Sequence, residues 1–286
     1  MKRWKQVCST MLAGTMLFQT PVVAAPKEEK EEKSPWVSDW KPEDGTTTGD
    51  AYQIYPVPQN IQYPSKTEFD MDKNVGVVSG EKVDKATNDY LNEVLEEFDR
   101  MPKKEKKAGD GSDIIIGVKG SGDEADKYFA DKKLDENLFE QSGGYALSAD
   151  GEDIVILGKD TEAAFYGVAT LKMMFSSFNG EKFYPVEIQD YASIDVRGYI
   201  EGFYGSWTHE QRKSLMEFTR DVKMNLYVYA SKTDAYHTSK WAELYPDDML
   251  NQFKELVKLQ EKNKTLRDHQ RTYQKSIFPS FLARSF

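Results

Sequence analysis

Polar residues that could do chemistry follow two predicted strands within residues 197–245. Glu201 to Gly205 form a glycine-rich turn after the first strand, and Lys232, Asp234 and His237 lie in the loop after the second. In a barrel of alternating strands and helices, the working residues stand at the carboxyl ends of the strands. Two neighbouring parallel strands would therefore bring both groups of residues into one site.

The residue types in these loops favour a polar small-molecule site. Gly202 has no side chain, so a ligand can approach its backbone closely. Lys232 carries a flexible point charge that can donate hydrogen bonds to hydroxyl oxygens. Aromatic residues border both loops: Tyr204, Trp207 and Tyr236.

The carboxylates near this site have alternative interpretations that the sequence leaves open. Glu201 is either a site residue or a buried structural carboxylate, and Asp234 is either a site residue or a cap of its own loop. Asp247 and Asp248 are adjacent acids, but they follow Pro246 and precede a predicted helix. That position favours a helix N-cap over an acid/base pair.

Several other classes of chemistry are disfavoured. The three histidines, His209, His237 and His269, have no metal-ligand spacing, and no G-x-S-x-G elbow is present. The net charge of −10 argues against a nucleic-acid partner, which would need a basic surface. We expect no metal and no cofactor.

The elements around the candidate site predict two units of a parallel βα fold. A strand over residues 196–202 leads to a helix that starts at a capping box, Thr208 to Gln211, and a second strand covers residues 225–230. The expected buried stripe of the first helix is Leu215, Met216, Phe218 and Val222. A second helix is predicted over residues 247–261. Because only 41 residues follow Tyr245, we expect an incomplete (β/α)8 barrel.

A separate mixed α/β domain is predicted over residues 51–190. Its strands are expected at residues 74–79 and 113–119 and in a hairpin over residues 145–158. Helices are expected at residues 83–101 and 161–177, where apolar residues recur at helical spacing. This region brings no acids, histidines or phosphate loop together, so its predicted role is support of the barrel part.

Both ends of the chain are predicted to lie outside these domains. Residues 1–24 resemble a signal peptide with a basic start, an apolar run and cleavage after Ala24, which predicts a secreted protein. The single cysteine, Cys8, would leave with it. Residues 25–50 are a charged linker rich in Pro, Gly and Thr. Residues 263–286 turn basic and lose the strand pattern, which indicates an aberrant or frameshifted end, the alternative being a genuine basic tail.

The motifs of residues 197–241 resemble those of glycoside hydrolase family 84, the β-N-acetylglucosaminidases that include O-GlcNAcases and bacterial enzymes called hyaluronidases. Arg197-Gly198 and Glu201 to Gly205 look like the opening strand and turn of that family. The second strand and its loop are similar at several positions: Met224-Asn225, Tyr227, Tyr229-Ala230, Lys232, Asp234, Tyr236-His237 and Trp241. The resemblance extends over roughly residues 52–262 and includes the α/β domain that precedes the barrel in bacterial members.

The resemblance implies a retaining, substrate-assisted hydrolase of terminal β-linked N-acetylglucosamine. In the family, two adjacent aspartates polarise the acetamide of the sugar and act as general acid and base, and no position of this chain matches them. By resemblance, Gly202 and Lys232 contact hydroxyls of the sugar, with Tyr204, Asp234 and Tyr236 as further site candidates. The chain departs from the family pattern at Ser206, Ser231 and Thr233.

Two functions of different classes follow. The first is a truncated, inactive piece of a secreted β-N-acetylglucosaminidase whose partners are glycans or glycoproteins containing N-acetylglucosamine. The second is a non-catalytic secreted module that binds carbohydrate or supports another domain. A folded module would bind sugar by itself, whereas an unfolded fragment would bind nothing.

Overall fold

The computed structural model describes residues 52–65, 67–102, 112–151, 153–177, 183–202 and 205–264. All of them belong to one of the two compact units into which the chain divides, Ser38–Phe286. The predicted signal peptide, the linker, and the tail beyond Lys264 lie outside the described residues.

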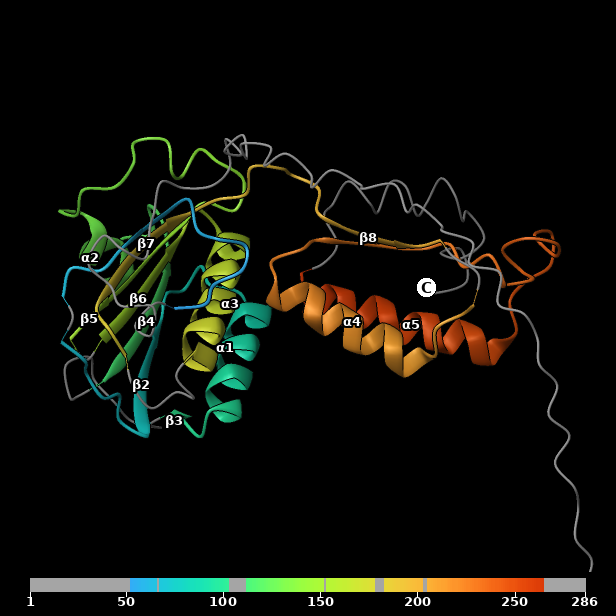
Figure 1. Ribbon diagram of the computed structural model, residues 1–286, viewed down its shortest axis with the longest axis horizontal. Helices are drawn as coiled ribbons and strands as arrows, with labels where there is room; N and C mark the ends of the chain where they lie inside the picture. Colours follow the sequence, from blue (N-terminus) through green and yellow to red (C-terminus); the bar gives the residue numbers. More distant parts are fainter. Residues whose placement is uncertain are drawn as a thin grey trace, which may run out of the picture. The chain divides into compact units, whose positions relative to one another are not determined.

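The first part of the described chain is a seven-stranded mixed sheet with three helices (Figure 1). The strand order is β1-β7-β5-β6-β4-β2-β3. The strands β3, β2, β4 and β6 run parallel, whereas β5 is antiparallel to both β6 and β7, and β7 is antiparallel to β1. The elements are β1 (Asn60–Gln62), β2 (Asn74–Ser79), α1 (Lys85–Glu97), β3 (Met101–Pro102), β4 (Asp113–Val118), α2 (Glu124–Phe129), β5 (Tyr145–Asp150), β6 (Asp153–Gly158), α3 (Thr161–Ser177) and β7 (Val186–Asp190). The predicted mixed α/β fold of this region is confirmed.

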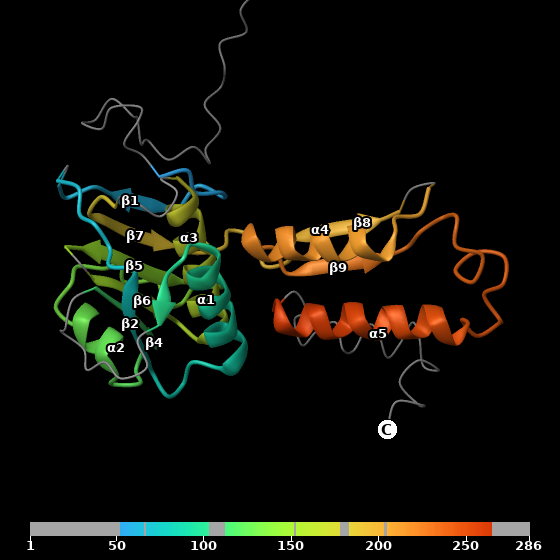
Figure 2. The same cartoon turned by 90° about the horizontal axis from the view of Figure 1, so that it is seen from below.

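The helices cover both faces of this sheet (Figure 2), and residues of β6 point alternately to the two faces. Ile154 and Ile156 are fully buried in the cluster that α1 and α3 complete. Val155 and Leu157, on the opposite face, pack in a second cluster with Phe129 of α2. A strand that is buried on both faces carries a continuous apolar run. The hairpin of β5 and β6 therefore forms the centre of the core.

The candidate site residues lie in the next part of the chain, where two parallel strands pair. Strand β8 (Gly198–Glu201) pairs with β9 (Leu226–Tyr229), so that Gly198 lies opposite Leu226 and Glu201 opposite Tyr229. A Cβ atom at Gly198 would lie 1.9 Å from the carbonyl oxygen of Leu226, so this close approach requires glycine. The two following helices, α4 (His209–Asp221) and α5 (Asp247–Lys262), contact each other.

The ends of α4 and α5 test two local predictions. Thr208 caps α4 through a complete capping box with Gln211, as predicted. The predicted cap of α5 is wrong, because Pro246 occupies the N-cap position and no side chain caps the helix. Asp247 and Asp248 instead lie in the first turn, where negative charge is favourable to the helix dipole.

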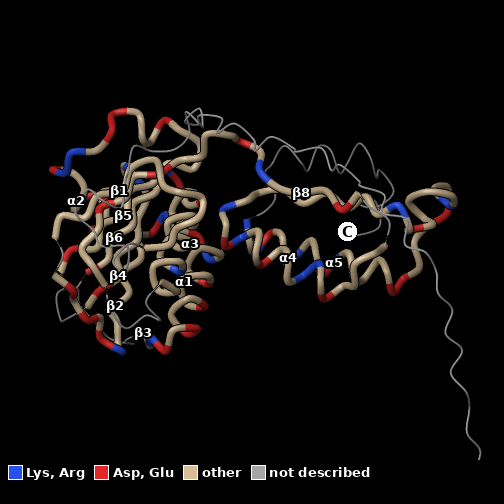
Figure 3. Tube along the Cα trace, viewed as in Figure 1, with Lys and Arg blue, Asp and Glu red and all other residues tan. Residues whose placement is uncertain are grey.

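The predicted buried stripe of α4 is wrong at Phe218, whose side chain is 55% exposed. Met216 is fully buried as expected, but the other buried residues of the helix are polar: Arg212, Thr219 and Arg220. Both arginines form ion pairs with carboxylates, which allows them to occupy the inner face. Basic and acidic residues occur along both α4 and α5 (Figure 3), and Arg212 and Arg220 of α4 are among the buried ones.

The β8–β9 part is joined to the seven-stranded sheet by buried polar contacts. The ammonium of Lys223 lies 2.8 Å from Asp190 Oδ2 at the end of β7, and 2.8 Å from the hydroxyl of Tyr145 on β5. Asp221 accepts a hydrogen bond of 2.9 Å from Tyr90 of α1. Burial and the charge of Asp190 raise the pKa of Tyr145 well above its ordinary value, so its hydroxyl keeps its proton. The domain boundary near residue 190 stays a prediction.

Among the described helices, none combines the length and apolar character that crossing a membrane requires.

Candidate functional site

The loops that follow β8 and β9 carry the two predicted sugar contacts. Gly202 comes directly after β8, and Lys232 lies three residues after the end of β9. Gly202 is half-buried, and a Cβ atom there would meet only Ile200 Cγ2, at 3.5 Å, so its backbone is open to a ligand. The side chain of Lys232 is exposed. Because the strands are parallel neighbours, both residues stand at the same edge of the small sheet.

Glu201 is a buried structural carboxylate, which was one of its two possible roles. It is 0% exposed and accepts two hydrogen bonds of 2.8 Å from the guanidinium of Arg212 on α4. The hydroxyl of Tyr227 on β9 donates a third at 2.6 Å, and the backbone N–H of Trp207 donates a longer one of 3.4 Å. Burial alone would raise the pKa of Glu201, but the hydrogen bonds from Arg212 and Tyr227 outweigh it and lower that pKa. A carboxylate held charged in this way is a poor proton donor at neutral pH.

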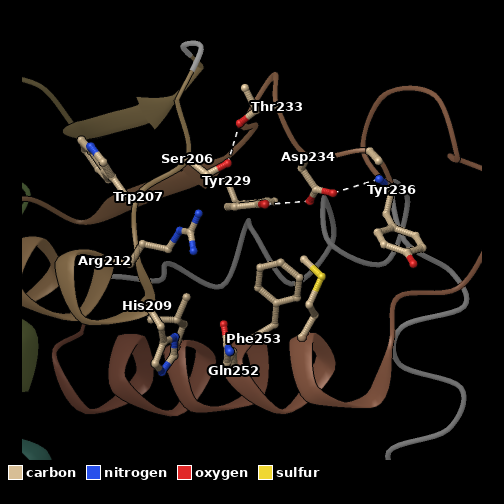
Figure 4. Close-up of a pocket in the computed structure, with 13 residues that line it drawn as sticks. Ser206, Trp207, His209, Arg212, Tyr229, Thr233, Asp234, Tyr236, Gln252 and Phe253 are labelled. Atoms are coloured by element: carbon tan, nitrogen blue, oxygen red, sulfur yellow. Dashed lines mark hydrogen bonds between the residues drawn. The ribbon is translucent and has the colours of Figure 1, made fainter.

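Asp234 caps the loop after β9, and its role in the site stays a prediction. It is only 7% exposed, and its Oδ2 accepts hydrogen bonds of 2.7 Å from Tyr229 and 2.9 Å from Tyr245. Its Oδ1 accepts a bond of 2.9 Å from the backbone N–H of Tyr236 (Figure 4). Burial, followed by the hydrogen bond to Asp234, raises the pKa of both Tyr229 and Tyr245, so both remain donors at neutral pH.

A cavity of about 300 Å³ lies beneath this loop, between the start of α4 and the side of α5 (Figure 4). The guanidinium of Arg212 stands 5.0 Å from the ring centre of Tyr229 on its wall. His209 contacts Glu255 at 2.8 Å. The lining residues are Ser206, Trp207, His209, Arg212, Tyr229, Thr233, Asp234, Ala235, Tyr236, Met249, Gln252, Phe253 and Leu256. Gly202 and Lys232 are absent from this lining, although Thr233, the residue after Lys232, belongs to it.

The roles of the remaining predicted site residues stay predictions. Tyr204 lies outside the described residues. Tyr236 is half-buried against Tyr245, with ring centres 5.1 Å apart, and His237 is exposed on the loop. Within the described part of the chain, no group of three or more His, Cys, Asp or Glu side chains could hold a metal ion.

Sequence reasoning missed Arg212 and Tyr227, which hold Glu201 in place. A signal for Arg212 was available, because it lies four residues before the buried Met216 and therefore on the same helix face. A charged residue at that position indicates a buried partner when a carboxylate ends the preceding strand. No comparable signal identified Tyr227, whose hydroxyl reaches Glu201 only because β8 and β9 pair in parallel.

We expect Glu201→Gln to lower the free energy of unfolding by about 3 kcal/mol at pH 7, because it leaves the buried Arg212 without its charge partner. The pKa of Glu201 is lower in the folded protein than in the unfolded chain, where it is about 4.3. The ionised carboxylate therefore stabilises the fold fully above about pH 4.3, and this stabilisation is lost as the pH falls through the folded-state pKa. The difference from wild type should therefore shrink below about pH 4. Urea unfolding followed by circular dichroism at pH 7 and pH 3 measures this. Glu210→Gln, at an exposed position of α4, is the matched control, and a wild-type-like unfolding energy of the Glu201 variant at pH 7 would contradict the anchoring role.

Comparison with protein families matches two regions of the chain. A family model described as beta-N-acetylglucosaminidase matches residues 197–267. A second, described as glycosyl hydrolase family 20, domain 2, matches residues 51–191. The curated protein O-GlcNAcases of Rattus norvegicus and Mus musculus are each 39% identical over 61 residues, which is 21% of this chain and 7% of theirs.

Solved structures match over a longer stretch. The structure of CpGH84D is 38% identical with a TM-score of 0.67, and the match covers 76% of this chain and 36% of that one. CpGH84B is 29% identical with a TM-score of 0.63, over 75% of this chain and 36% of that one. A family 20 exo-β-N-acetylglucosaminidase of Vibrio harveyi, 16% identical with a TM-score of 0.52, covers 74% of this chain and 34% of its own and shares the fold alone. The chain thus spans about a third of the length of these structures. It is similar to the β-N-acetylglucosaminidases of glycoside hydrolase family 84, which confirms the resemblance seen in its motifs.

Proposed function

We propose that this chain contains the first, sugar-contacting part of the barrel of a secreted β-N-acetylglucosaminidase. Such an enzyme acts on terminal β-linked N-acetylglucosamine of glycans or glycoproteins. The observation that carries the proposal is the placement of Gly202 and Lys232 after two paired parallel strands, β8 and β9. An open backbone and an exposed ammonium at one edge suit the hydroxyls of a sugar ring. The match of residues 197–267 to the beta-N-acetylglucosaminidase model supports this choice of ligand.

The same strands support the proposal that β8, α4, β9 and α5 open a (β/α)8 barrel. The strands run parallel, and a helix follows each of them along the chain. Tyr199 and Tyr227 lie on the face toward the helices, whereas Ile200 lies on the other face and is 61% exposed. An apolar residue on that second face is typical of strands that are covered on both sides, as in a barrel.

We propose that this 286-residue chain by itself binds sugar without cleaving it. In the mechanism that the resemblance implies, an aspartate polarises the acetamide of the substrate, the acetamide oxygen attacks the anomeric carbon, and a neighbouring aspartate protonates the leaving group. Neither described carboxylate at the strand ends is available for these steps. Glu201 is paired with Arg212, and Asp234 accepts three hydrogen bonds, one of them from Tyr229 of β9.

Lys232→Met should weaken the binding of N-acetylglucosamine about 10- to 100-fold, since hydrogen bonds from charged donors contribute about 1.5–3 kcal/mol. Calorimetric titration of the folded chain with the monosaccharide measures this. The matched control is Lys240→Met, which removes another exposed lysine from the same loop. Equal affinity of the Lys232 variant and the control would show that Lys232 is no sugar contact.

The absence of turnover is a separate expectation. The purified chain should release no detectable phenol from an aryl β-N-acetylglucosaminide, because Glu201 and Asp234, the described carboxylates near the strand ends, are both held in hydrogen bonds. The reference in the same assay is an intact β-N-acetylglucosaminidase at equal concentration. Clear, purification-stable hydrolysis by this chain would refute the proposal of an inactive chain.

The second candidate is a non-catalytic secreted module that binds carbohydrate or supports another domain. It is favoured by the large seven-stranded part, whose described residues form an extensive buried apolar core. A glycan array separates the leading proposal from the support role of this candidate. A module that only supports another domain leaves every glycan unbound in the folded state, whereas the leading proposal requires selective binding of terminal N-acetylglucosamine.

Secretion is part of the proposal and rests on the signal-peptide pattern of residues 1–24. The expected mature protein begins at Ala25, after cleavage behind Ala24. Mass spectrometry of the protein exported by an expressing cell measures this terminus. A chain that stays in the cell with its first 24 residues attached would refute secretion.

A further inference from the structure

Three hydroxyl groups from the two candidate sugar-binding loops meet in one cluster. Ser206 Oγ lies 3.1 Å from Ser231 Oγ and 2.5 Å from Thr233 Oγ1, and the latter two atoms are 3.2 Å apart. Ser206 belongs to the loop after β8, whereas Ser231 and Thr233 belong to the loop after β9. Figure 4 shows the contact between Ser206 and Thr233. We propose that this hydroxyl triangle is a positioning group that holds Gly202 and Lys232 at a fixed separation for sugar binding.

Three hydroxyls at these distances can satisfy one another completely. Each hydroxyl has one proton to donate and lone pairs that accept, so a closed cycle of three bonds gives every member a donor and an acceptor. Ser231 is fully buried, and among the described residues Ser206 and Thr233 are the hydrogen-bond partners of its hydroxyl. A buried hydroxyl without a partner is costly, so the position of Ser231 depends on both neighbours.

The triangle lies next to each proposed sugar contact along the chain. Ser231 and Thr233 flank Lys232 on either side, and Ser206 lies four residues after Gly202. Gly205, with a φ of +96°, lets the chain turn just before Ser206, where a residue with a side chain would be strained. Both proposed sugar contacts thus lie within a few residues of the cluster along the chain.

Other anchors hold each loop separately. Asp234 ties the loop after β9 to Tyr229 of its own strand and to Tyr245, and Glu201 receives the backbone N–H of Trp207 in the loop after β8. These contacts fix each loop against its own surroundings. The hydroxyl triangle is a direct contact from one loop to the other, so it controls how far apart the two loops stand.

A pre-set separation matters for affinity because a ligand that must order two loops loses binding free energy in doing so. Ser206 and Thr233 are exposed, so removing either hydroxyl should leave the fold and its global stability nearly unchanged. The effect should appear in loop order and in sugar affinity. This inference rests on the proposed sugar site, but loop order can be measured without sugar.

The experiment uses Thr233→Val, which keeps the shape of the side chain, and Ser206→Ala. Thr233→Ser, which retains the hydroxyl, tests rescue, and Ser239→Ala, at an exposed position of the same loop, is the matched control. Hydrogen exchange by nuclear magnetic resonance follows two amides in the folded chain. The amide of Trp207 bonds to Glu201 in one loop, and that of Asp234 bonds to the carbonyl of Ser231 in the other.

The expected result is an effect that crosses from one loop to the other. Thr233→Val should speed exchange at Trp207, and Ser206→Ala should speed exchange at Asp234, each roughly fivefold, the factor for one net hydrogen bond. The affinity for N-acetylglucosamine should fall by a similar factor in both variants. The double variant should be little worse than either single one, because the cycle is already broken. Thr233→Ser and Ser239→Ala should behave as wild type.

Each outcome decides the inference. If each variant changes exchange only in its own loop, or if Ser239→Ala has the same effect, the triangle does not connect the loops and the inference is wrong. If exchange changes across the loops but wild type binds no sugar, the triangle stands and the proposed function fails. If wild type binds sugar and both variants bind it equally well, the positioning role for the ligand is overturned.

Discussion

The buried pair of Glu201 and Arg212 is the contact on which the geometry of the small sheet depends. One carboxylate at the end of β8 receives hydrogen bonds from α4, from Tyr227 of β9 and from the turn at Trp207. Removing two charges from water is costly, and only such complete hydrogen bonding offsets that cost. The pair therefore permits one arrangement of strand, helix and turn. Gly202, the next residue after Glu201, takes its position from that arrangement.

A second set of buried and half-buried charges joins this arrangement to the large sheet. Lys223 reaches Asp190 and Tyr145, and Asp221 reaches Tyr90 and Lys172. Both Asp221 and Lys223 lie at the end of α4, so the helix that carries Arg212 at one end is held against β5, β7 and α1 at the other. Buried pairs are screened by salt much less than surface pairs. The seven-stranded part thus supports the small sheet through polar contacts, which are distinct from the apolar packing of its own core.

Local sequence signals predicted most helices and strands, whereas they could not predict contacts between residues that are distant in the sequence. The β5–β6 hairpin, the helix α3 and the capping box at Thr208 were readable because their periodicity or spacing lies within a few residues. The three-residue strand β1 was not, since it exists only by pairing with β7, more than 120 residues later along the chain. The roles of Glu201 and Asp234 stayed open for the same reason. Burial and partners from other elements decide whether a carboxylate anchors or reacts, and no local pattern records them.

The closed cycle of Ser206, Ser231 and Thr233 has a consequence for how this loop pair can diverge among related proteins. The three residues coincide with the positions at which the chain departs from the family pattern, and they lie in contact. Replacing Ser206 or Thr233 would remove one of the two hydrogen-bond partners of the buried Ser231 hydroxyl. The contribution of each residue to stability therefore depends on the other two. Lineages that share this loop pair would then inherit the three residues as a set, and positions distant in sequence would covary.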